Sequence, residues 1–366
     1  MAGSGFGTNF RITTWGETHG AGVGVVVDGC PAGLPLERED VQKYLDRRKP
    51  GQSKYTTQRK EGDQVEILSG IFEGRTTGTP ISMVVYNKDQ RSKDYSNIKD
   101  IYRPGHADFT FDMKYGFRDY RGGGRSSGRE TIGRVAAGAV AAKVLKELGI
   151  EIKAYAKAIA GIEVSKDHFD FAEMNNNPFN MPDKEAAKLV QEKADQMIKE
   201  MDSIGGIIEC QITGMQVGIG ETVFDKLDAE LSKAIMSIGS VKGFEIGDGF
   251  EAANLRGSEN NDDFICVDGK VEKETNHSGG VLGGMSDGSA IVFRAAIKPT
   301  PSIAQTQKTV NRDLDNVEIE IHGRHDPMIV PRAVVVVESM AAVTILDGVL
   351  KNLGATMDNI KKIYGE

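Results

Sequence analysis

A run of small apolar residues places the strongest constraint on how this chain folds. Residues 128–148 carry alanine, glycine and valine on most faces of a helix, with no single apolar stripe. A helix of that kind is more stable inside a protein than on its surface. Ser127 and Glu130 have the spacing of a capping box, and Gly149 follows as a stop signal. We therefore predict a helix over 128–148 that runs through the core.

Strand and helix patterns occur on both sides of this helix. Apolar alternation or short apolar runs predict strands at 10–15, 22–29, 65–70, 80–86, 206–215, 290–299 and 317–323. Helical patterns cover 183–201, 225–239 and 337–353, the second with Asp225 as its cap and Gly239 as its terminator. No tandem period marks a linker, although the Asn-rich residues 175–180 would tolerate a boundary. We expect one intertwined α+β domain over residues 1–366.

The composition excludes several classes of protein. A chain of 366 residues with 39% hydrophobic and 27% charged residues is typical of a soluble globular protein. Its net charge of -8 opposes binding to nucleic acid or to an anionic membrane, so any anion must be bound locally. Three widely spaced cysteines indicate neither a disulfide framework nor a metal site. With no signal peptide and no long uncharged apolar window, we expect a cytoplasmic protein.

The segment 87–127 has little periodicity but many arginines, tyrosines, aspartates and glycines, which is typical of a functional loop region. It leads into YRGGGRSSGRETIG at 120–133. Glycines allow close backbone approach, and the N-terminus of the following helix favours an anion. Arg125 adds a charge, and Ser126 and Ser127 add hydroxyl donors. The alternative is a plain glycine-rich connection to a well-capped helix; four arginines within twelve residues favour a ligand.

Several polar residues in other loops are candidates for the same site. His19 and His106 each lie between glycine-rich turns, where their ordinary pKa suits proton transfer, although either alone is more often structural. Arg324 could hold an anion and Asp326 could orient a base, with a tight polar turn as the alternative. The ordinary interpretation of the basic stretch 46–60 is a charged loop exposed to solvent. Because the net charge of the chain is negative, a small polyanionic substrate is favoured over nucleic acid.

Seven motifs in this order resemble the chorismate synthase family: WGETHGAG, DRRKPGQSKYTTQR, YRPGHADFTF, DYRGGGRSSGRET, NHSGGVLGG, IKPTPSI and GRHDP. The resemblance spans residues 9–345. The resemblance implies a carbon–oxygen lyase acting on phosphates, at the end of the shikimate pathway of aromatic amino acid biosynthesis. It would convert 5-enolpyruvylshikimate-3-phosphate to chorismate and phosphate by anti-1,4-elimination. Reduced FMN would be required without net redox change. The implied fold is a helical core sandwiched between antiparallel β-sheets, generally in a homotetramer.

The resemblance also implies roles for individual residues. His19 would protonate the departing phosphate, His106 would manage the protonation state of reduced flavin, and Asp326 would assist near flavin N5. Arg48 and Lys54 would bind anionic substrate or NADP; arginine is common in the family where Lys54 stands, and lysine lacks its bidentate fork. The implied FMN contacts are Arg125, Ser126, Ser127, Gly239, Ser240, Gly283, Lys298, Pro299, Thr300, Pro301, Ser302 and Arg324.

Two other functions remain open on the sequence alone. A noncatalytic binder of phosphorylated metabolites would use the same arginines but has no need of two proton-transferring histidines. A flavin oxidoreductase would consume reductant in step with substrate. We find no appended flavin-reductase domain and no clear nicotinamide fingerprint, so we expect NADPH to act indirectly, through a separate reductase.

Overall fold

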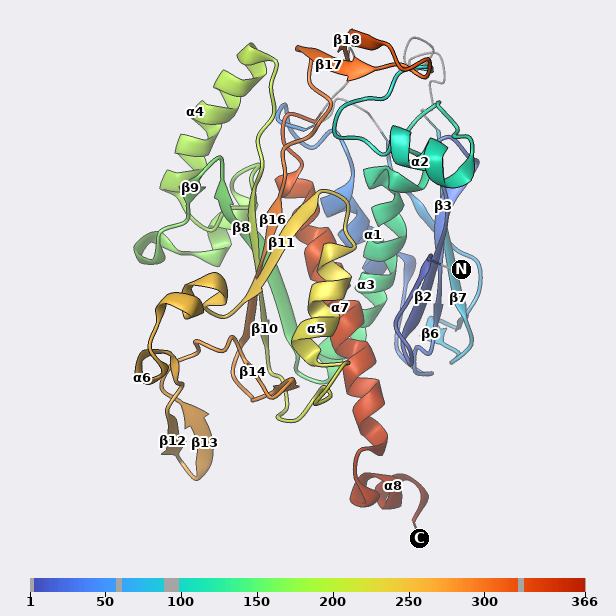
Figure 1. Cartoon of the computed structure of the whole chain (residues 1–366). Coiled ribbons are helices and arrows are strands. Elements are labelled where there is room, and N and C mark those ends of the chain that lie inside the picture. Colours follow the sequence, from blue (N-terminus) through green and yellow to red (C-terminus); the bar gives the residue numbers. More distant parts are fainter. Residues whose placement is uncertain (1–2, 57–60, 89–98, 322–325, 366) are drawn as a thin grey trace.

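The chain forms two five-stranded antiparallel sheets with helices between them, in a computed structural model that describes residues 3–56, 61–88, 99–321 and 326–365 (Figure 1). The first sheet has the strand order β1 (Gly5–Phe6), β2 (Arg11–Gly16), β3 (Gly22–Asp28), β7 (Ile81–Tyr86), β4 (Val65–Ile67). The second has the order β11 (Val241–Ile246), β16 (Ile291–Ile297), β10 (Gly206–Thr213), β8 (Glu151–Ile159), β9 (Ile162–Glu163). This arrangement confirms the predicted α+β class with a helical core.

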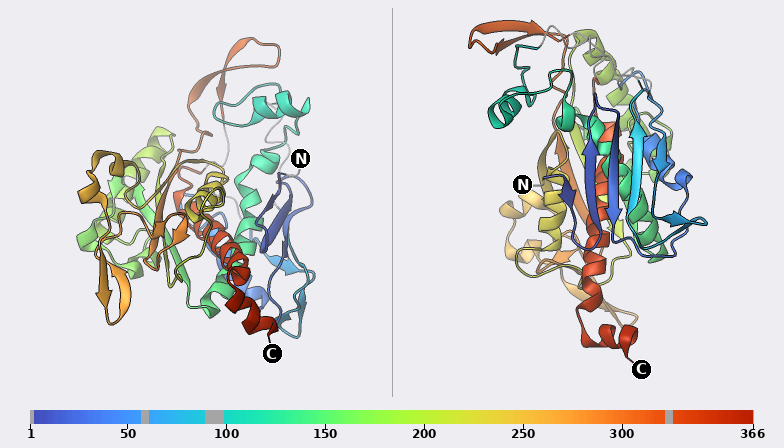
Figure 2. Two further views of the ribbon diagram at one scale, coloured as in Figure 1. Left: turned by 60° about the horizontal axis from the view of Figure 1, so that its bottom comes forward. Right: turned by 90° about the vertical axis from the view of Figure 1, so that its right-hand side faces the viewer.

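The helices of the core are α1 (Arg38–Arg48), α3 (Thr131–Glu147), α5 (Leu227–Met236) and α7 (Val330–Lys351). α3 and α7 pack on each other. On their outer sides, α3 packs on β3 of the first sheet and α7 packs on β8 and β10 of the second. Figure 2 shows the two sheets outside this pair of helices. The segment Val330–Gly354 has the length and hydropathy of a membrane-crossing helix, but 83% of its most apolar window is buried. That burial is the property of a core helix.

Small residues let α3 and α7 approach closely. A Cβ added to Gly138 would lie 2.2 Å from the Ser339 Cβ and 2.5 Å from its Cα, both on α7. On its other side α3 meets the first sheet, where a Cβ on Gly133 would lie 3.0 Å from the Gly24 carbonyl oxygen. The composition of α3 thus follows from contact with a neighbour on two faces.

The carboxylate of Asp347 on α7 fixes the chain that leads into β2. Its Oδ1 accepts backbone N–H groups from Thr8, Asn9 and Phe10, at 3.0, 2.6 and 2.9 Å, and its Oδ2 lies 3.1 Å from the Lys351 Nζ. Because Asp347 is 4% exposed, its charge needs such partners. The contact joins the first sheet to the last core helix.

The remaining elements lie around this core. At the top of Figure 1, α2 (Asp108–Tyr115) lies beside β17 (Thr306–Val310) and β18 (Asn316–Glu320). The others are β5 (Ile71–Phe72), β6 (Arg75–Thr76), α4 (Lys184–Glu200), α6 (Gly257–Asn260), β12 (Phe264–Val267), β13 (Lys270–Lys273), β14 (Val281–Leu282), β15 (Met285–Ser286) and α8 (Met357–Tyr364).

The predicted capping box of Ser127 and Glu130 and the predicted cap at Asp225 are not formed, although Ser127 does cap the turn that leads into α3. The Ser127 hydroxyl accepts the Arg129 N–H at 3.3 Å and begins a 3-10 turn, Gly128–Glu130, so α3 itself begins at Thr131. The Glu130 carboxylate does not close a capping box, because it pairs with Arg134 at 2.9 Å. Helix α5 begins after Lys226 without a side-chain cap at Asp225, and it ends at Met236, before Gly239.

Other elements were not predicted. α1, α2, β8 and β11 were missed, and α2 lies inside the segment expected to be irregular. α7 begins seven residues earlier than the predicted 337, at Val330. Pro331 is tolerated in its first turn, since the N–H groups there have no partner within the helix.

We predict that Gly138→Ala destabilises the fold although alanine is the better helix former. The added methyl overlaps α7, and overpacking of this kind costs about 1–3 kcal/mol of the free energy of unfolding. Denaturant titration measures the loss. Gly257→Ala is the matched control, because an added Cβ there meets nothing within 4 Å. Equal stabilities of the two variants would contradict the close approach of α3 and α7.

Candidate active site

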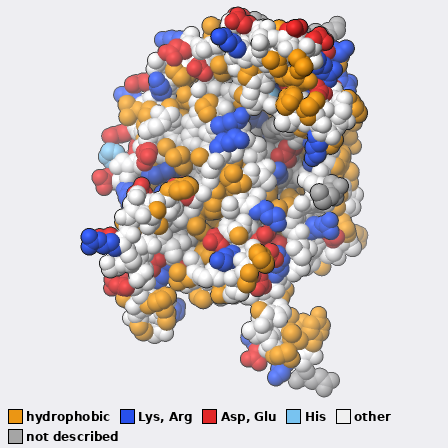
Figure 3. Space-filling view, viewed as in Figure 1, with side chains coloured by type: hydrophobic (Ala, Val, Ile, Leu, Met, Phe, Trp, Pro, Cys, Tyr) orange, Lys and Arg blue, Asp and Glu red, His pale blue; other side chains and the backbone are white. Residues whose placement is uncertain are grey.

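A cavity of about 1220 Å³ lies at the end of the core where α3 and α7 begin. Its walls come from segments that are distant in sequence: the end of β2, the turn before α3, the turn after α5, the chain after β16 and the start of α7. In the space-filling view the surface is hollowed below α2, with basic side chains close by (Figure 3). Two helix N-termini near one cavity favour an anionic ligand.

The glycine turn before α3 holds His19 against the backbone. A Cβ on Gly122 would lie 2.6 Å from the His19 Cδ2, so a side chain at this position would displace the imidazole ring. Gly124 has φ +51°, a conformation that favours glycine. The Ser126 hydroxyl donates to the Gly123 carbonyl at 2.6 Å and therefore serves the turn itself. The turn thus brings His19, Ser126 and Ser127 to the cavity wall.

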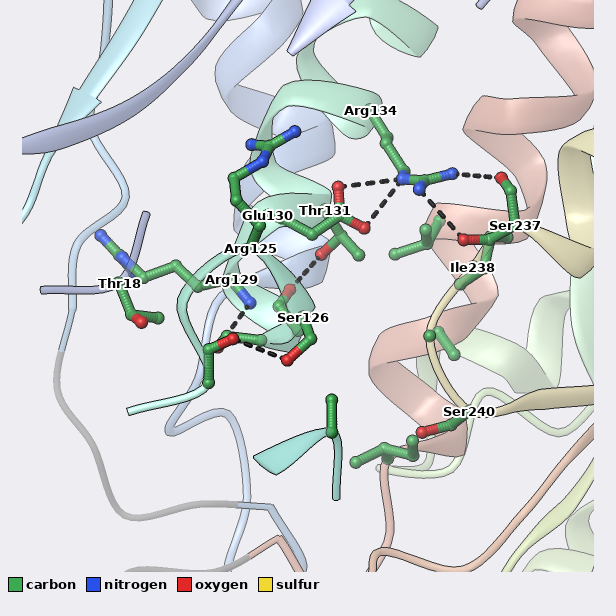
Figure 4. A pocket seen from close by; sticks show the side chains of 18 of the residues that line it. Thr18, Arg125, Ser126, Arg129, Glu130, Thr131, Arg134, Ser237, Ile238 and Ser240 are labelled. Carbon is green, nitrogen blue, oxygen red and sulfur yellow. Dashed lines mark hydrogen bonds and ion pairs between the residues drawn. The ribbon is translucent and has the colours of Figure 1, made fainter. Parts of the chain in front are cut away.

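Arg125 brings a positive charge that no carboxylate neutralises within the described part of the chain. Its guanidinium donates to the Thr14 Oγ1 at 2.6 Å, to the Gly16 carbonyl at 3.1 Å and, more weakly, to the Ser4 Oγ at 3.4 Å. Neutral acceptors orient the group but leave its charge in place. By contrast, Arg134 bridges Glu130 and Ser237 across the cavity wall (Figure 4).

His106 is a neutral imidazole with its proton on Nδ1. Nδ1 lies 2.9 Å from the Pro104 carbonyl oxygen, which can only accept, so Nδ1 is the donor. Nε2 lies 2.9 Å from the Ser302 Oγ and accepts its hydroxyl proton. Burial, together with the positive charge of Arg103, lowers the pKa of His106 to about 4. Near neutral pH this side chain accepts a hydrogen bond at Nε2 and carries a single proton, on Nδ1.

The structure brings most of the predicted site residues together. Asp326 pairs with Arg332 at 2.8 Å, and the Lys298 Nζ donates to the Gly105 carbonyl at 3.0 Å. The predicted residues that line the cavity are His19, Arg48, His106, Arg125, Ser126, Ser127, Gly239, Ser240, Lys298, Thr300, Pro301, Ser302 and Asp326. Their chemical roles remain predictions.

Three predicted residues lie elsewhere. Lys54 is on the surface, where its Nζ pairs with the Asp195 carboxylate of α4 at 2.8 Å and 62% of its side chain is exposed. Gly283 forms the turn between β14 and β15, which its φ of +61° suits. Pro299 is in the predicted segment but is not a lining residue. Arg324 lies outside the described residues.

Sequence reasoning missed several lining residues. Among them are Arg103, Arg129, Arg134 and Lys242. Arg129 belongs to the dense run of arginines that marked the glycine turn, so a signal existed for it. Lys242 follows Gly239 and Ser240, which the resemblance marks as FMN contacts, but no pattern in the sequence points to the lysine itself.

The lining fits a phosphorylated flavin. Apolar residues from the first turns of α7, including Ala333, Val336 and Met340, offer a surface for a flat ring. Thr18 Oγ1 and Thr300 Oγ1 are buried lining atoms without a hydrogen-bond partner among the described residues. A buried orphan hydroxyl is costly unless a ligand satisfies it. Together with the uncompensated charge of Arg125, these groups suit a ring system that carries a phosphate.

Comparisons with known proteins agree on one family. The family model described as chorismate synthase matches residues 10–350. The chain is 68% identical over 364 residues to a chorismate synthase of Lachnospira eligens, covering 100% of both chains. It is 56% identical over 355 residues to that of Methanosarcina mazei, covering 96% and 97%. A crystal structure of chorismate synthase superimposes with a TM-score of 0.77 at 31% identity, covering 98% of this chain and 96% of the other.

We predict that His106 stays neutral, with its proton on Nδ1, from pH 5 to 8, because its folded pKa is about 4. Nitrogen-15 NMR of labelled histidine measures this, with His106→Gln assigning the signal. The unfolded chain takes up the proton below its ordinary pKa of 6.5 and the folded chain only near 4, so the contribution of His106 to stability falls as pH drops between them. A titration midpoint near 6.5 would refute the assignment.

Proposed function

Because the chain belongs to the chorismate synthase family of lyases, we propose that it converts 5-enolpyruvylshikimate-3-phosphate to chorismate and phosphate by anti-1,4-elimination with reduced FMN. The observation that carries the proposal is the meeting of two histidines, a carboxylate and an uncompensated arginine in one cavity beside two helix N-termini. That cavity offers groups for charge stabilisation and for proton transfer at the same place.

Residues of the chain would hold both ligands. Arg125, Ser126, Ser127 and Thr300 would bind FMN, with its ring along the apolar side chains of α7. Reduced FMN, when bound, supplies electron density to the reaction without net redox change. The basic side chains of the cavity would bind the carboxylates and the phosphate of the substrate.

The two histidines would have different tasks. His19, held on Gly122, would donate a proton to the departing phosphate oxygen, which makes phosphate a better leaving group. His106 would act as an acceptor at Nε2, since its single proton is engaged with Pro104. Asp326 would act near the flavin N5, and its ion pair with Arg332 fixes its orientation.

We further propose a homotetramer in the cytoplasm, to which a separate flavin reductase supplies reduced FMN at the expense of NADPH. Large exposed apolar side chains support subunit contacts; Phe224 is 90% exposed and Phe250 81%. The FMN roles of Gly283, Pro299 and Arg324 remain part of the proposal, as does a nucleotide role of Lys54.

The direct test supplies the purified protein with 5-enolpyruvylshikimate-3-phosphate and chemically reduced FMN under anaerobic conditions. We expect many turnovers of chorismate and phosphate on a single charge of reduced flavin. Oxidised FMN is the control and should give none. Consumption of one reductant per product would indicate an oxidoreductase, and binding without any product would indicate the noncatalytic phosphorylated-metabolite binder.

His19→Ala should lower kcat by about 10²-fold or more, because a general acid contributes about that factor. Calorimetry should show FMN binding within about twofold of the wild type, because the change removes the proposed proton donor and none of the residues that would hold the cofactor. The matched control is His168→Ala, whose side chain is 51% exposed and pairs with Glu185 on the surface. Unchanged kcat in the His19 variant would remove this residue from the mechanism.

A further inference from the structure

A buried carboxylate lies behind the cavity wall and joins two of its arginines. The Asp63 side chain is 0% exposed and does not line the cavity. Its Oδ2 pairs with the Arg48 Nη2, and its Oδ1 lies 2.9 Å from the Arg129 Nη1. Arg48 and Arg129 do line the cavity, although their side chains are only 2% and 9% exposed.

The three residues belong to separate parts of the fold. Arg48 is the last residue of α1, Asp63 lies in the loop before β4, and Arg129 lies in the turn before α3. Burial raises the pKa of Asp63, but the charges of the two arginines outweigh it and hold the pKa below its ordinary value. Asp63 therefore stays ionised and links these elements through charged hydrogen bonds.

The guanidinium of Arg129 is paired with two carboxylates of the protein. Its Nε donates to the Asn87 Oδ1 at 2.5 Å, its Nη1 to Asp63, and its Nη2 lies 2.6 Å from the Glu61 Oε2. Arg129 is thus held between two carboxylates and anchors Asp63 on one side, although its Nη2 makes no hydrogen bond of good geometry among the described residues.

The donors of Arg48 are not all occupied. Its Nη1 makes only long contacts, 3.4 Å to the Gly128 carbonyl and 3.5 Å to the Thr131 Oγ1. Its Nε is buried and has no hydrogen-bond partner among the described residues. An unpaired buried N–H is costly, so a group in the cavity that accepts hydrogen bonds would stabilise it. The Arg332 Nε also fixes the backbone of Arg48, by donating to its carbonyl at 3.0 Å.

We propose that Asp63 is a positioning residue, which holds the Arg48 guanidinium so that its free N–H groups bind a carboxylate or phosphate of the substrate. The proposal rests on the proposed function in that this substrate is an anion. Arg129 acts as the second anchor of Asp63, and Arg48 is the group that contacts the ligand.

The test is the affinity of the flavin-free protein for inorganic phosphate, measured by calorimetry. Asp63→Asn makes the wall more positive, so electrostatics alone would tighten phosphate binding. Loss of positioning instead raises the Kd, by about tenfold if one charge-assisted hydrogen bond is lost. The two explanations thus predict opposite signs. A Kd that is unchanged or lower would overturn the proposal.

The matched control is Glu338→Gln. Glu338 pairs bidentately with Arg47, the neighbour of Arg48 on α1, at 2.6 and 2.8 Å, and neither of these two residues lines the cavity. This variant also loses a buried charge, yet it should leave the phosphate Kd within about twofold of the wild type. An equal rise in both variants would show that lost stability, and not positioning, is the cause.

A second variant and a second measurement complete the test. Arg48→Lys keeps the charge beside Asp63 but lacks the Nε donor, so it should also raise the phosphate Kd, and it decides the matter if Asp63→Asn does not fold. In turnover, Asp63→Asn should raise the substrate KM about tenfold and change kcat less than about threefold. Equal loss in kcat and unchanged KM would contradict positioning. An inactive wild type would refute the proposed function, whereas the phosphate measurements would still test Asp63.

Discussion

The contact between α3 and α7 at Gly138 and Ser339 is the constraint on which the rest of the structure depends. Because a glycine meets a serine there, the two helix axes approach closely, and each helix is left one outer face for a sheet. The same approach brings the two helix N-termini to one end of the core. Peptide dipoles that point the same way add at that end, and this is where the cavity lies. Packing in the middle of the molecule therefore determines the electrostatics at its end.

Some cationic side chains at the cavity are paired with carboxylates and others are not, in a chain whose net charge is -8. Arg103 is paired with Asp108, and Arg332 with Asp326, so these arginines contribute orientation more than net charge. Arg125 and Lys298 are held by neutral oxygens and keep their full charge. A ligand anion thus meets a few uncompensated charges among groups that are already fixed, and little reorganisation is needed when it binds.

The sequence allowed the local parts of this arrangement to be predicted. The small residues of α3 indicated a buried helix, and glycines beside arginines indicated the loop that carries Arg125 and holds His19. α1 was missed because only Val41, Leu45 and Arg48 are buried on it, and a buried arginine interrupts the apolar spacing. No sequence pattern predicts the ion pairs of Asp63 with Arg48 and Arg129, because these residues come from three separate segments that only tertiary packing brings together. The surface position of Lys54 could not be predicted for the same reason, because its partner Asp195 belongs to a helix far along the chain.

The Asp347 contact also bears on the order of events during synthesis. The N–H groups of Thr8 to Phe10 find their acceptor 337 to 339 residues later. At about 10 residues per second, a ribosome needs on the order of half a minute to add that length. The backbone N–H groups that lead into β2 therefore cannot reach this anchor until Asp347 has been synthesised. Chaperones that shield exposed strand edges would have their greatest effect in this interval.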